Sequence, residues 1–139
     1  MIKLVHILIA ILLTPLALAE GMDDLRQKLY GNFYHGDGDY GLTILTFNPD
    51  YTYRLKEEFD VASDEISEGT WNIVDGSKIE FHSAKGRNLE PMIIIRSKVK
   101  HDKTLSLLPV SDQASHKEMM EKFGSTYNLY TRHENLGIF

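Results

Sequence analysis

The residues with the plainest capacity for chemistry lie in one short loop, His35-Gly-Asp-Gly-Asp39. Carboxylates that alternate with glycine can converge on a hard cation, because glycine lets the backbone turn tightly around the ion. The loop does not match an EF-hand, since it lacks a third acid in phase and a distal glutamate. Its glycines equally suit a plain hairpin turn. We expect that hairpin, with cation binding at His35, Asp37 and Asp39 as the minor alternative and no assigned metal site.

The sequence contains no recognisable catalytic motif. The sequence contains no cysteine, no Gly-x-Ser-x-Gly elbow and no glycine-rich phosphate loop. The acidic neighbours Glu57-Glu58 and Asp64-Glu65 would point to opposite faces of a strand, so they do not form a catalytic pair. The five histidines after residue 19 lack the paired spacing of a zinc site: His35, His82, His101, His116 and His133. We therefore expect a protein that is not an enzyme and has no cofactor.

Four aromatic residues form the candidate ligand-binding site: Tyr53, Trp71, Phe81 and Tyr127. An apolar pocket into which a few hydroxyl groups converge is a common design for binding small molecules. The same side chains would also serve simply to fill a hydrophobic core. Both alternatives require strands that turn these aromatic residues inward.

A period of two predicts such strands between Tyr40 and Ser83. Alternate side chains of a strand lie on opposite faces, so each segment has one dry face and one wet face. The dry-face residues are Tyr51, Tyr53, Leu55, Trp71, Ile73, Ile79 and Phe81. Asn48-Pro-Asp50 and Asp75-Gly76 join consecutive segments, since both favour tight reversals of the chain. This pattern predicts an antiparallel sheet that closes over a core.

Further strands flank this centre. We expect them at residues 31–35, 40–47, 92–99, 104–110 and 125–132. Within 92–99 the apolar run leaves the inward face ambiguous, although Ile93, Ile95 and Val99 share one parity against Arg96 and Lys98. Pro109 should end its strand, because proline cannot donate to a ladder. The predicted fold class is therefore mainly β: an antiparallel up-and-down meander of about eight strands, forming a small barrel or strongly curled sheet.

A short N-terminal helix is predicted at residues 22–30. Asp23 or Asp24 would cap its start, because a carboxylate can accept from the free amides of the first turn. Leu25 and Leu29 are four residues apart and would share one face. Gly31 would end the helix.

A second helix is predicted before the last strand. Ser115-His-Lys-Glu118 matches a capping box, and Gly124 matches a C-terminal stop. Met119, Met120 and Phe123 have helical spacing, and we expect this face to lie across one end of the sheet. A methionine-rich face could also touch a ligand, since methionine adapts to irregular shapes.

Residues 1–19 have the three parts of a secretory signal peptide: a basic start at Lys3, an apolar run at Leu4–Leu13, and the small-x-small ending Ala17-Leu-Ala19. The apolar run is shorter than the roughly 20 residues of a membrane span. We therefore expect cleavage before Glu20 and no stable membrane insertion. The mature chain, residues 20–139, would be one domain. An exported chain without cysteine favours a bacterial envelope, so we expect a periplasmic or secreted protein.

The charge distribution argues against nucleic acid as a partner. Loss of Lys3 with the leader leaves 14 basic and 20 acidic residues, a net charge of −6 with histidine neutral. Nucleic-acid binding relies on basic residues to neutralise phosphates. Acidic residues concentrate in 37–68 and basic residues in 78–103. We expect these segments to pair across neighbouring strands, with a basic patch for an anionic partner as the alternative.

Three stretches resemble the lipocalin-like small β-barrels of bacterial envelope proteins. They are Leu29-Tyr-Gly31-Asn-Phe33-Tyr, Leu45-Thr-Phe-Asn-Pro-Asp-Tyr51-Thr-Tyr53, and Glu68-Gly-Thr-Trp71-Asn-Ile73 followed by Asp75-Gly-Ser-Lys-Ile79-Glu-Phe81. The likeness spans about half of the mature chain. The chain departs from that pattern in having Phe33 where tryptophan is usual, in its shorter length and in the helix before its last strand. The resemblance implies a barrel whose interior is filled by side chains or holds one small ligand.

Two functions from different classes remain open. The first is a carrier or sensor of a small apolar ligand inside the barrel, at the four aromatic residues named above. The second is an envelope protein–protein interaction module, such as an inhibitor or accessory subunit, with a filled core and an acidic loop at residues 60–68. An empty cavity beside Trp71 would favour the first function, and a solid interior would favour the second.

Overall fold

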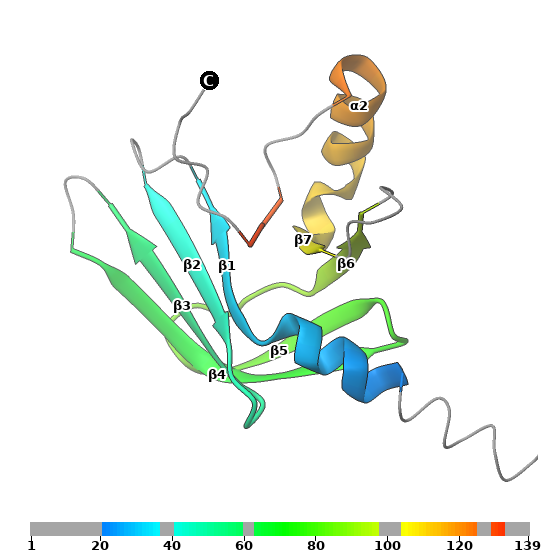
Figure 1. The fold of residues 1–139 in the computed structure, drawn as a ribbon. Helices are drawn as coiled ribbons and strands as arrows, with labels where there is room; N and C mark the ends of the chain where they lie inside the picture. Colours follow the sequence, from blue (N-terminus) through cyan, green and yellow to red (C-terminus); the bar gives the residue numbers. More distant parts are fainter. Residues whose placement is uncertain (1–20, 37–40, 60–62, 98–103, 125–128, 133–139) are drawn as a thin grey trace, which may run out of the picture.

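The computed structural model describes residues 21–36, 41–59, 63–97, 104–124 and 129–132. Seven strands form one antiparallel sheet, in which each strand pairs with its neighbours in the sequence (Figure 1). The strands are β1 (Gly31–His35), β2 (Leu42–Phe47), β3 (Thr52–Glu58), β4 (Glu65–Val74), β5 (Lys78–Lys85), β6 (Met92–Arg96) and β7 (Leu105–Pro109). This is the predicted up-and-down meander. The predicted leader, residues 1–19, lies outside the described residues.

The period-two pattern is confirmed at the centre of the sheet. In β3, Tyr53 and Leu55 are buried whereas Arg54 between them is exposed. In β4, Trp71 and Ile73 are buried and alternate with exposed polar residues. The dry faces of these strands therefore form the barrel interior, because burial of apolar surface is the main favourable term in folding.

Tyr51 belongs to the β2–β3 turn rather than to the dry face of β3, which corrects the prediction. Its φ of 66° is left-handed, and the residue is 43% exposed. Its amide donates to the Asn48 carbonyl at 3.1 Å and closes the turn. The hydroxyl and the amide of Thr52 donate to Asp50 at 2.6 and 3.0 Å. These bonds to the charged form lower the pKa of the Asp50 carboxyl.

The β4–β5 hairpin turns at Asp75-Gly76, as predicted. Both residues have positive φ, 55° and 65°. The Ser77 amide donates to the Val74 carbonyl at 3.4 Å across them. Two consecutive positive φ values are typical of the primed turns, whose twist matches that of the flanking strands.

The inward face of β6, which the sequence left ambiguous, is the parity opposite to Ile93 and Ile95; Val99 lies outside the described residues. Met92 and Ile94 are buried, at 3% and 7% exposed, whereas Ile93 and Ile95 are only half-buried. The cause is the register: Met92 pairs with Ile79, and Ile94 pairs with Leu107. Partners in an antiparallel ladder point to the same face, and both of these partners lie in the core.

The acidic stretch before Trp71 is strand from Glu65 to Glu68, which corrects that part of the predicted loop at residues 60–68; residues 60–62 lie outside the described residues. β4 already begins at Glu65, and β3 continues to Glu58. On the wet face, Arg54 forms an ion pair with Glu68 at 3.7 Å. Glu57 has the inward parity of Tyr53 and Leu55, its side chain is only 16% exposed, and it forms an ion pair with Arg87 at 3.0 Å. The Arg87–Glu57 pair joins the basic and acidic segments, but Arg87 lies in the β5–β6 loop, so this pair is not the expected pairing across neighbouring strands. β5 extends to Lys85, two residues beyond Ser83, where the predicted period-two stretch ends.

Helix α1, at residues 21–29, packs at one end of the barrel (Figure 1). Leu25 and Leu29 are buried in the core, as their spacing predicted. Asp23 and Asp24 do not cap the helix, because residue 21 is already helical. They form ion pairs with basic residues one turn later, at 3.0 and 2.6 Å. The chain leaves α1 for β1 through Gly31, whose φ is 101°.

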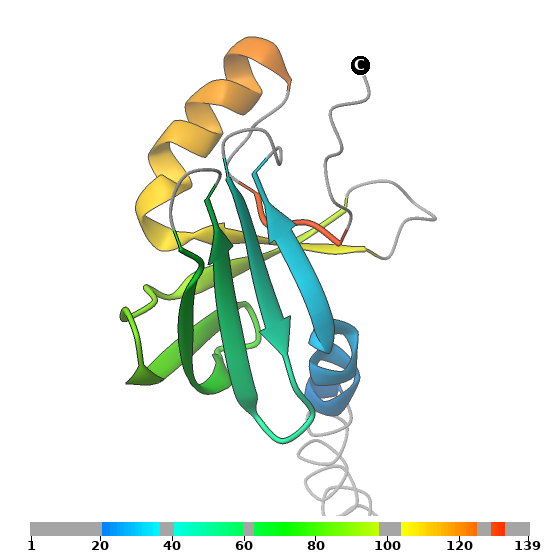
Figure 2. The same ribbon diagram turned by 90° about the vertical axis from the view of Figure 1, so that its left-hand side faces the viewer.

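Helix α2 (Gln113–Phe123) follows the short 3-10 helix η1 (Val110–Asp112). It projects from the end of the barrel opposite α1 (Figures 1 and 2). Gly124, with φ 68°, ends it as predicted, and its amide donates to the Met120 carbonyl at 3.0 Å. Within the described ranges, neither helix has the length and apolar content that crossing a bilayer requires.

The predicted packing and capping of α2 are both wrong. None of its eleven residues, all within the described part of the chain, is buried, and Phe123 is 69% exposed. Ser115 lies inside the helix, so the predicted capping box does not form there; its hydroxyl donates to the Asp112 carbonyl at 3.4 Å. η1 joins the base of the helix to β7, and within the helix His116 and Met119 are half-buried.

Two bridges close the sheet into a nearly closed barrel. Thr131 bridges Tyr34 of β1, and Tyr130 bridges Leu107 of β7, so residues 129–132 link the first strand to the last (Figure 2). Each bridge has two reciprocal backbone hydrogen bonds, at 2.7 and 2.9 Å for the first and 2.9 and 2.8 Å for the second. Of the predicted last strand, residues 125–132, only these last four residues are described.

Arg132 fastens this closing segment to the start of the barrel. Its guanidinium lies 4.0 Å from the centroid of the Phe33 ring, a favourable cation–π arrangement. It donates to the Asn32 carbonyl at 3.2 Å and to the Lys28 carbonyl near the end of α1. That helix end has carbonyl groups without helical partners, and a cation there is favourable. Burial lowers the pKa of Arg132.

Candidate functional site

The predicted aromatic site forms a packed cluster in the barrel interior. Tyr53 and Phe81 meet edge to face, with centroids 5.1 Å apart. Phe47 joins them to Trp71, at 6.0 Å from Phe81 and 5.1 Å from Trp71. Three of the four predicted residues are thus brought together. The fourth, Tyr127, lies outside the described residues.

This cluster contains two polar atoms without partners. The Tyr53 hydroxyl and the Trp71 indole nitrogen are buried, and neither has a hydrogen-bond partner among the described residues. Each buried polar group without a hydrogen-bond partner lowers the stability of the folded state by about 1–3 kcal/mol. Further rings surround Trp71, with Tyr51 at 5.8 Å and Tyr30 at 6.3 Å. Neither of the two hollows described next is lined by Tyr53, Trp71 or Phe81.

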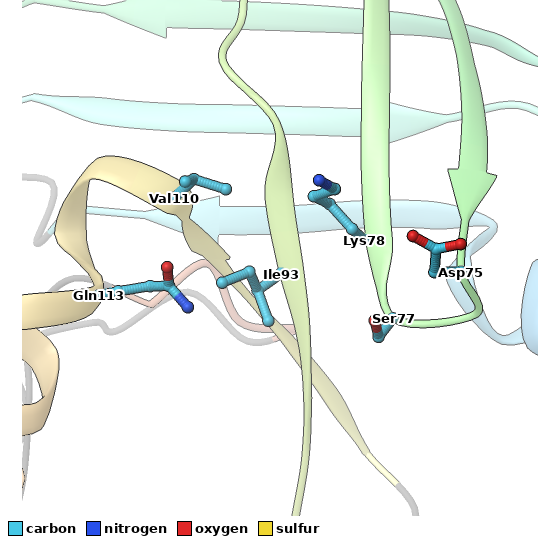
Figure 3. A pocket seen from close by; sticks show the side chains of 6 residues that line it. All are labelled: Asp75, Ser77, Lys78, Ile93, Val110 and Gln113. Carbon is cyan, nitrogen blue, oxygen red and sulfur yellow. The ribbon is translucent and has the colours of Figure 1, made fainter.

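The larger hollow, which we call the outer hollow, has a volume of about 370 Å³. It is lined by Asp75, Ser77, Lys78, Ile93, Val110 and Gln113. Figure 3 shows Val110 and Gln113 on one side of Ile93, and the turn before β5 with Lys78 on the other side. The two charged residues are of opposite sign, so the outer hollow has no net charge to select an ion.

The second hollow, which we call the seam hollow, lies beside the closing bridges and has a volume of about 200 Å³. Its lining residues come from β1, the β5–β6 loop, β6, β7, η1 and the closing segment. They are His35, Arg87, Leu89, Glu90, Met92, Pro109, Asp112 and Tyr130. The seam hollow gathers five side chains capable of acid–base or ionic chemistry, and these residues are far apart in the sequence.

Tyr130 is the centre of the seam hollow. The backbone bridge to Leu107 places its ring on the core, where the residue is buried. The imidazole of His35, at the end of β1, stacks on this ring with centroids 4.8 Å apart and an interplanar angle of 21°. Burial raises the pKa of the Tyr130 phenol, and nearby Arg87, which also bonds it, opposes that rise. The phenol is therefore neutral at pH 7.

The β5–β6 loop brings Arg87 and Glu90 to the hollow. β5 pairs with β6 only at Lys78 and Ile79, so the chain makes a wide loop before it enters β6. The Arg87 amide donates to the buried Ser67 hydroxyl at 3.0 Å. A Cβ on Gly86 would lie 2.4 Å from that same hydroxyl oxygen. Only glycine therefore fits this close approach of loop and strand.

Glu90 connects the seam hollow to the base of α2. Its two carboxylate oxygens accept from the amide and hydroxyl of Ser111, at 2.9 and 2.7 Å. The Val110 amide donates to the Pro91 carbonyl at 3.0 Å beside them. Asp112 follows directly, and its side chain makes no capping hydrogen bond to α2. Asp112 thus lines the hollow without capping the helix.

The cation site considered for the His35–Asp39 loop has only one described ligand. His35 stacks on Tyr130, while Asp37 and Asp39 lie outside the described residues. Among the residues that the structure describes, no three histidines or acids are grouped closely enough to hold a metal ion. His82 is exposed on the wet face of β5, as its parity predicted.

Sequence reasoning missed the seam hollow. In the sequence, His35 is a candidate ligand for a cation only, and no pattern assigns a role to Arg87 or Glu90. No local pattern relates them to Tyr130, because the closure of the barrel brings them together. Comparisons with protein-family models, with curated proteins and with solved structures found no match for this chain.

Proposed function

We propose that this chain is an exported, non-enzymatic binding protein that acts as a protein–protein interaction module, with α2 as its contact element. The signal-peptide pattern of residues 1–19 supports export to the periplasm or beyond. The resemblance to lipocalin-like envelope barrels supports a binding role. The single observation that favours a protein partner is an eleven-residue helix with no buried residue.

The side chains along one face of α2, half-buried at His116 and Met119 and exposed at Met120 and Phe123, indicate the chemistry of that partner. His116, Met119, Met120 and Phe123 follow the spacing i, i+3, i+4 and i+7 of helices that dock into apolar grooves. Met120 is 44% and Phe123 is 69% exposed. On the rest of the helix, Lys117 and Glu121 approach to 4.0 Å, and Lys122 pairs with Glu118. The charges thus cancel along the helix, and the partner is a protein with an apolar groove.

Site-specific cross-linking tests this function. A photoreactive phenylalanine analogue is placed at position 123 and, as a matched control, at Phe59, which is 42% exposed at the end of β3. We expect a discrete cross-linked protein from position 123 in the envelope of the native host, lost on Met120→Ser and absent from position 59. Absence of a cross-link at 123, or identical products at both positions, would reject α2 as the contact element.

A second candidate function is supported by the unpartnered atoms of Tyr53 and Trp71. A small, mostly apolar ligand in the barrel interior would satisfy them if it presented one polar atom, as expected of a carrier or sensor. Native mass spectrometry of protein purified from its own host tests this candidate. A bound mass that is lost in Tyr53→Phe would support it. The bare polypeptide mass, unchanged after lipids are added, would end it.

A further inference from the structure

We propose that the seam hollow binds the alkylammonium group of a primary amine. The site is separate from the exposed apolar face of α2 and does not depend on the partner proposed for that helix. Three properties of the hollow lead to this ligand class: its net charge, its hydrogen-bond acceptors and its partly apolar lining.

The net charge of the seam hollow favours a cation. Its ionic lining residues are one base, Arg87, and two acids, Glu90 and Asp112. Arg87 is already paired with Glu57 at 3.0 Å, outside the hollow's lining. The charge of Arg87 is thereby neutralised, and the two remaining carboxylates leave the hollow negative. A free carboxylate ligand would face two acids, which argues against an anion and favours an ammonium group.

The acceptors of the seam hollow match the three donors of an ammonium group. The Asp112 carboxylate makes no capping bond. Each Glu90 oxygen accepts one bond from Ser111 and keeps a second acceptor position. The neutral Tyr130 phenol and the imidazole of His35 stand beside them. Charge-assisted hydrogen bonds to carboxylates are the strongest of these contacts.

The volume of the seam hollow and the apolar part of its lining suit a short alkyl chain. Leu89, Met92 and Pro109 line the hollow, and Met92 belongs to the core. At roughly 30 Å³ per water, a volume of about 200 Å³ holds about six or seven water molecules. Pockets for drug-sized ligands are larger, at roughly 300–1,000 Å³. A short aliphatic amine fits these limits, whether it is a free small molecule or the lysine side chain of a polypeptide.

Nuclear magnetic resonance titration of the mature protein tests the proposal. The probes are 1-aminobutane, pentanoate as an anion of similar size, and Nα-acetyl-lysine methylamide as a lysine side chain within a peptide. We expect 1-aminobutane to shift the amide signals of His35, Glu90, Asp112 and Tyr130 saturably, and pentanoate to leave them unchanged. Tighter binding of the lysine probe would identify a polypeptide source, and tighter binding of 1-aminobutane would identify a free amine.

Two variants make the test specific. Asp112→Asn removes one carboxylate charge while keeping a residue that suits a helix N-terminus, and it should weaken 1-aminobutane binding by about tenfold or more. Glu118→Gln removes a carboxylate charge from α2 outside the hollow, and it should leave the affinity unchanged. Equal binding of pentanoate, absence of shifts at the seam with 1-aminobutane, or an unchanged affinity in Asp112→Asn would each overturn the proposal.

Discussion

The imidazole of His35 stacks on the ring of Tyr130, with centroids 4.8 Å apart, at the place where the last described segment closes the barrel. The stack joins the end of β1 to the closing segment by side chains, next to the backbone bridges that join them by hydrogen bonds. The residues that line the seam hollow here therefore belong to the same segments that close the barrel.

Loss of the Tyr130 ring should destabilise the barrel. Tyr130→Ala is expected to lower the free energy of unfolding by about 3 kcal/mol, because it removes a buried aromatic ring and leaves a cavity. Tyr130→Phe keeps the ring and removes only the hydroxyl that bonds Arg87, so a loss of about 1 kcal/mol is expected. Urea denaturation measures both values. Phe59→Ala, at an exposed ring, is the control and should change stability by less than about 0.5 kcal/mol.

Stability should fall at alkaline pH through Tyr130. Burial raises the pKa of this phenol in the folded protein above its ordinary value, which is about 10 in an unfolded chain. A raised pKa gives stability that is fully present below about pH 10 and is lost as the pH rises through the folded-state value. Unfolding measured from pH 8 upward should therefore show a steeper alkaline loss in the wild type than in Tyr130→Phe. Tyr34→Phe is the control, and it should lose stability at alkaline pH as steeply as the wild type does.

The close approach at Gly86 can be tested against a matched glycine. Gly86 has φ 81°, and a Cβ there would lie 2.4 Å from the Ser67 hydroxyl oxygen and 2.7 Å from the Ile66 carbonyl oxygen. Gly124 has a similar φ of 68°, but no atom of the described residues lies within 4 Å of its added Cβ. Gly124→Ala should therefore lower the free energy of unfolding by about 1 kcal/mol, from left-handed backbone strain alone. Gly86→Ala should lower it by about 2 kcal/mol or more, because the clash adds to that strain. Similar losses in the two variants would contradict the contact with Ser67.

The bond between Glu90 and Ser111 should order the base of α2. Glu90→Ala removes the acceptor of both the amide and the hydroxyl of Ser111. We expect faster hydrogen exchange at the Ser111 and Asp112 amides. The strands should change little, because the Glu90–Ser111 hydrogen bonds lie outside the core. Glu118→Ala, on the exposed face of α2, is the matched control. Unchanged exchange at Ser111 in Glu90→Ala would show that the Glu90–Ser111 hydrogen bonds do not order this segment.

The meander was predictable from the sequence because its central strands have one dry face each. Around Trp71 and around Tyr53, polar neighbours alternate with apolar ones, and the parity is unambiguous. β6 is apolar at both parities, from Met92 to Ile95, so the sequence cannot say which side faces inward. Its pairing with Ile79 and Leu107 decides the question, and that pairing is a long-range property.

The seam hollow could not be predicted for a related reason. His35 and Tyr130 are separated by most of the chain, and Arg87 and Glu90 lie in a loop without a regular period. Local propensity contains no information about contacts that arise when a sheet closes on itself. Helix α2 shows the converse limit: its residues predicted the helix and its stop at Gly124, but not that its apolar face would lie in solvent.

Native-state hydrogen exchange at the Tyr130 and Thr131 amides is the most direct measurement of whether the barrel closes and forms this hollow. These amides donate to the carbonyl groups of Leu107 and Tyr34 at 2.8 and 2.9 Å. Closure predicts that both exchange slowly, at rates comparable to the amides of Leu107 and Tyr34, which make the reciprocal bonds. Exchange at the rate of free coil, while the amides of β2 to β4 remain protected, would contradict the closed seam and the binding site built on it.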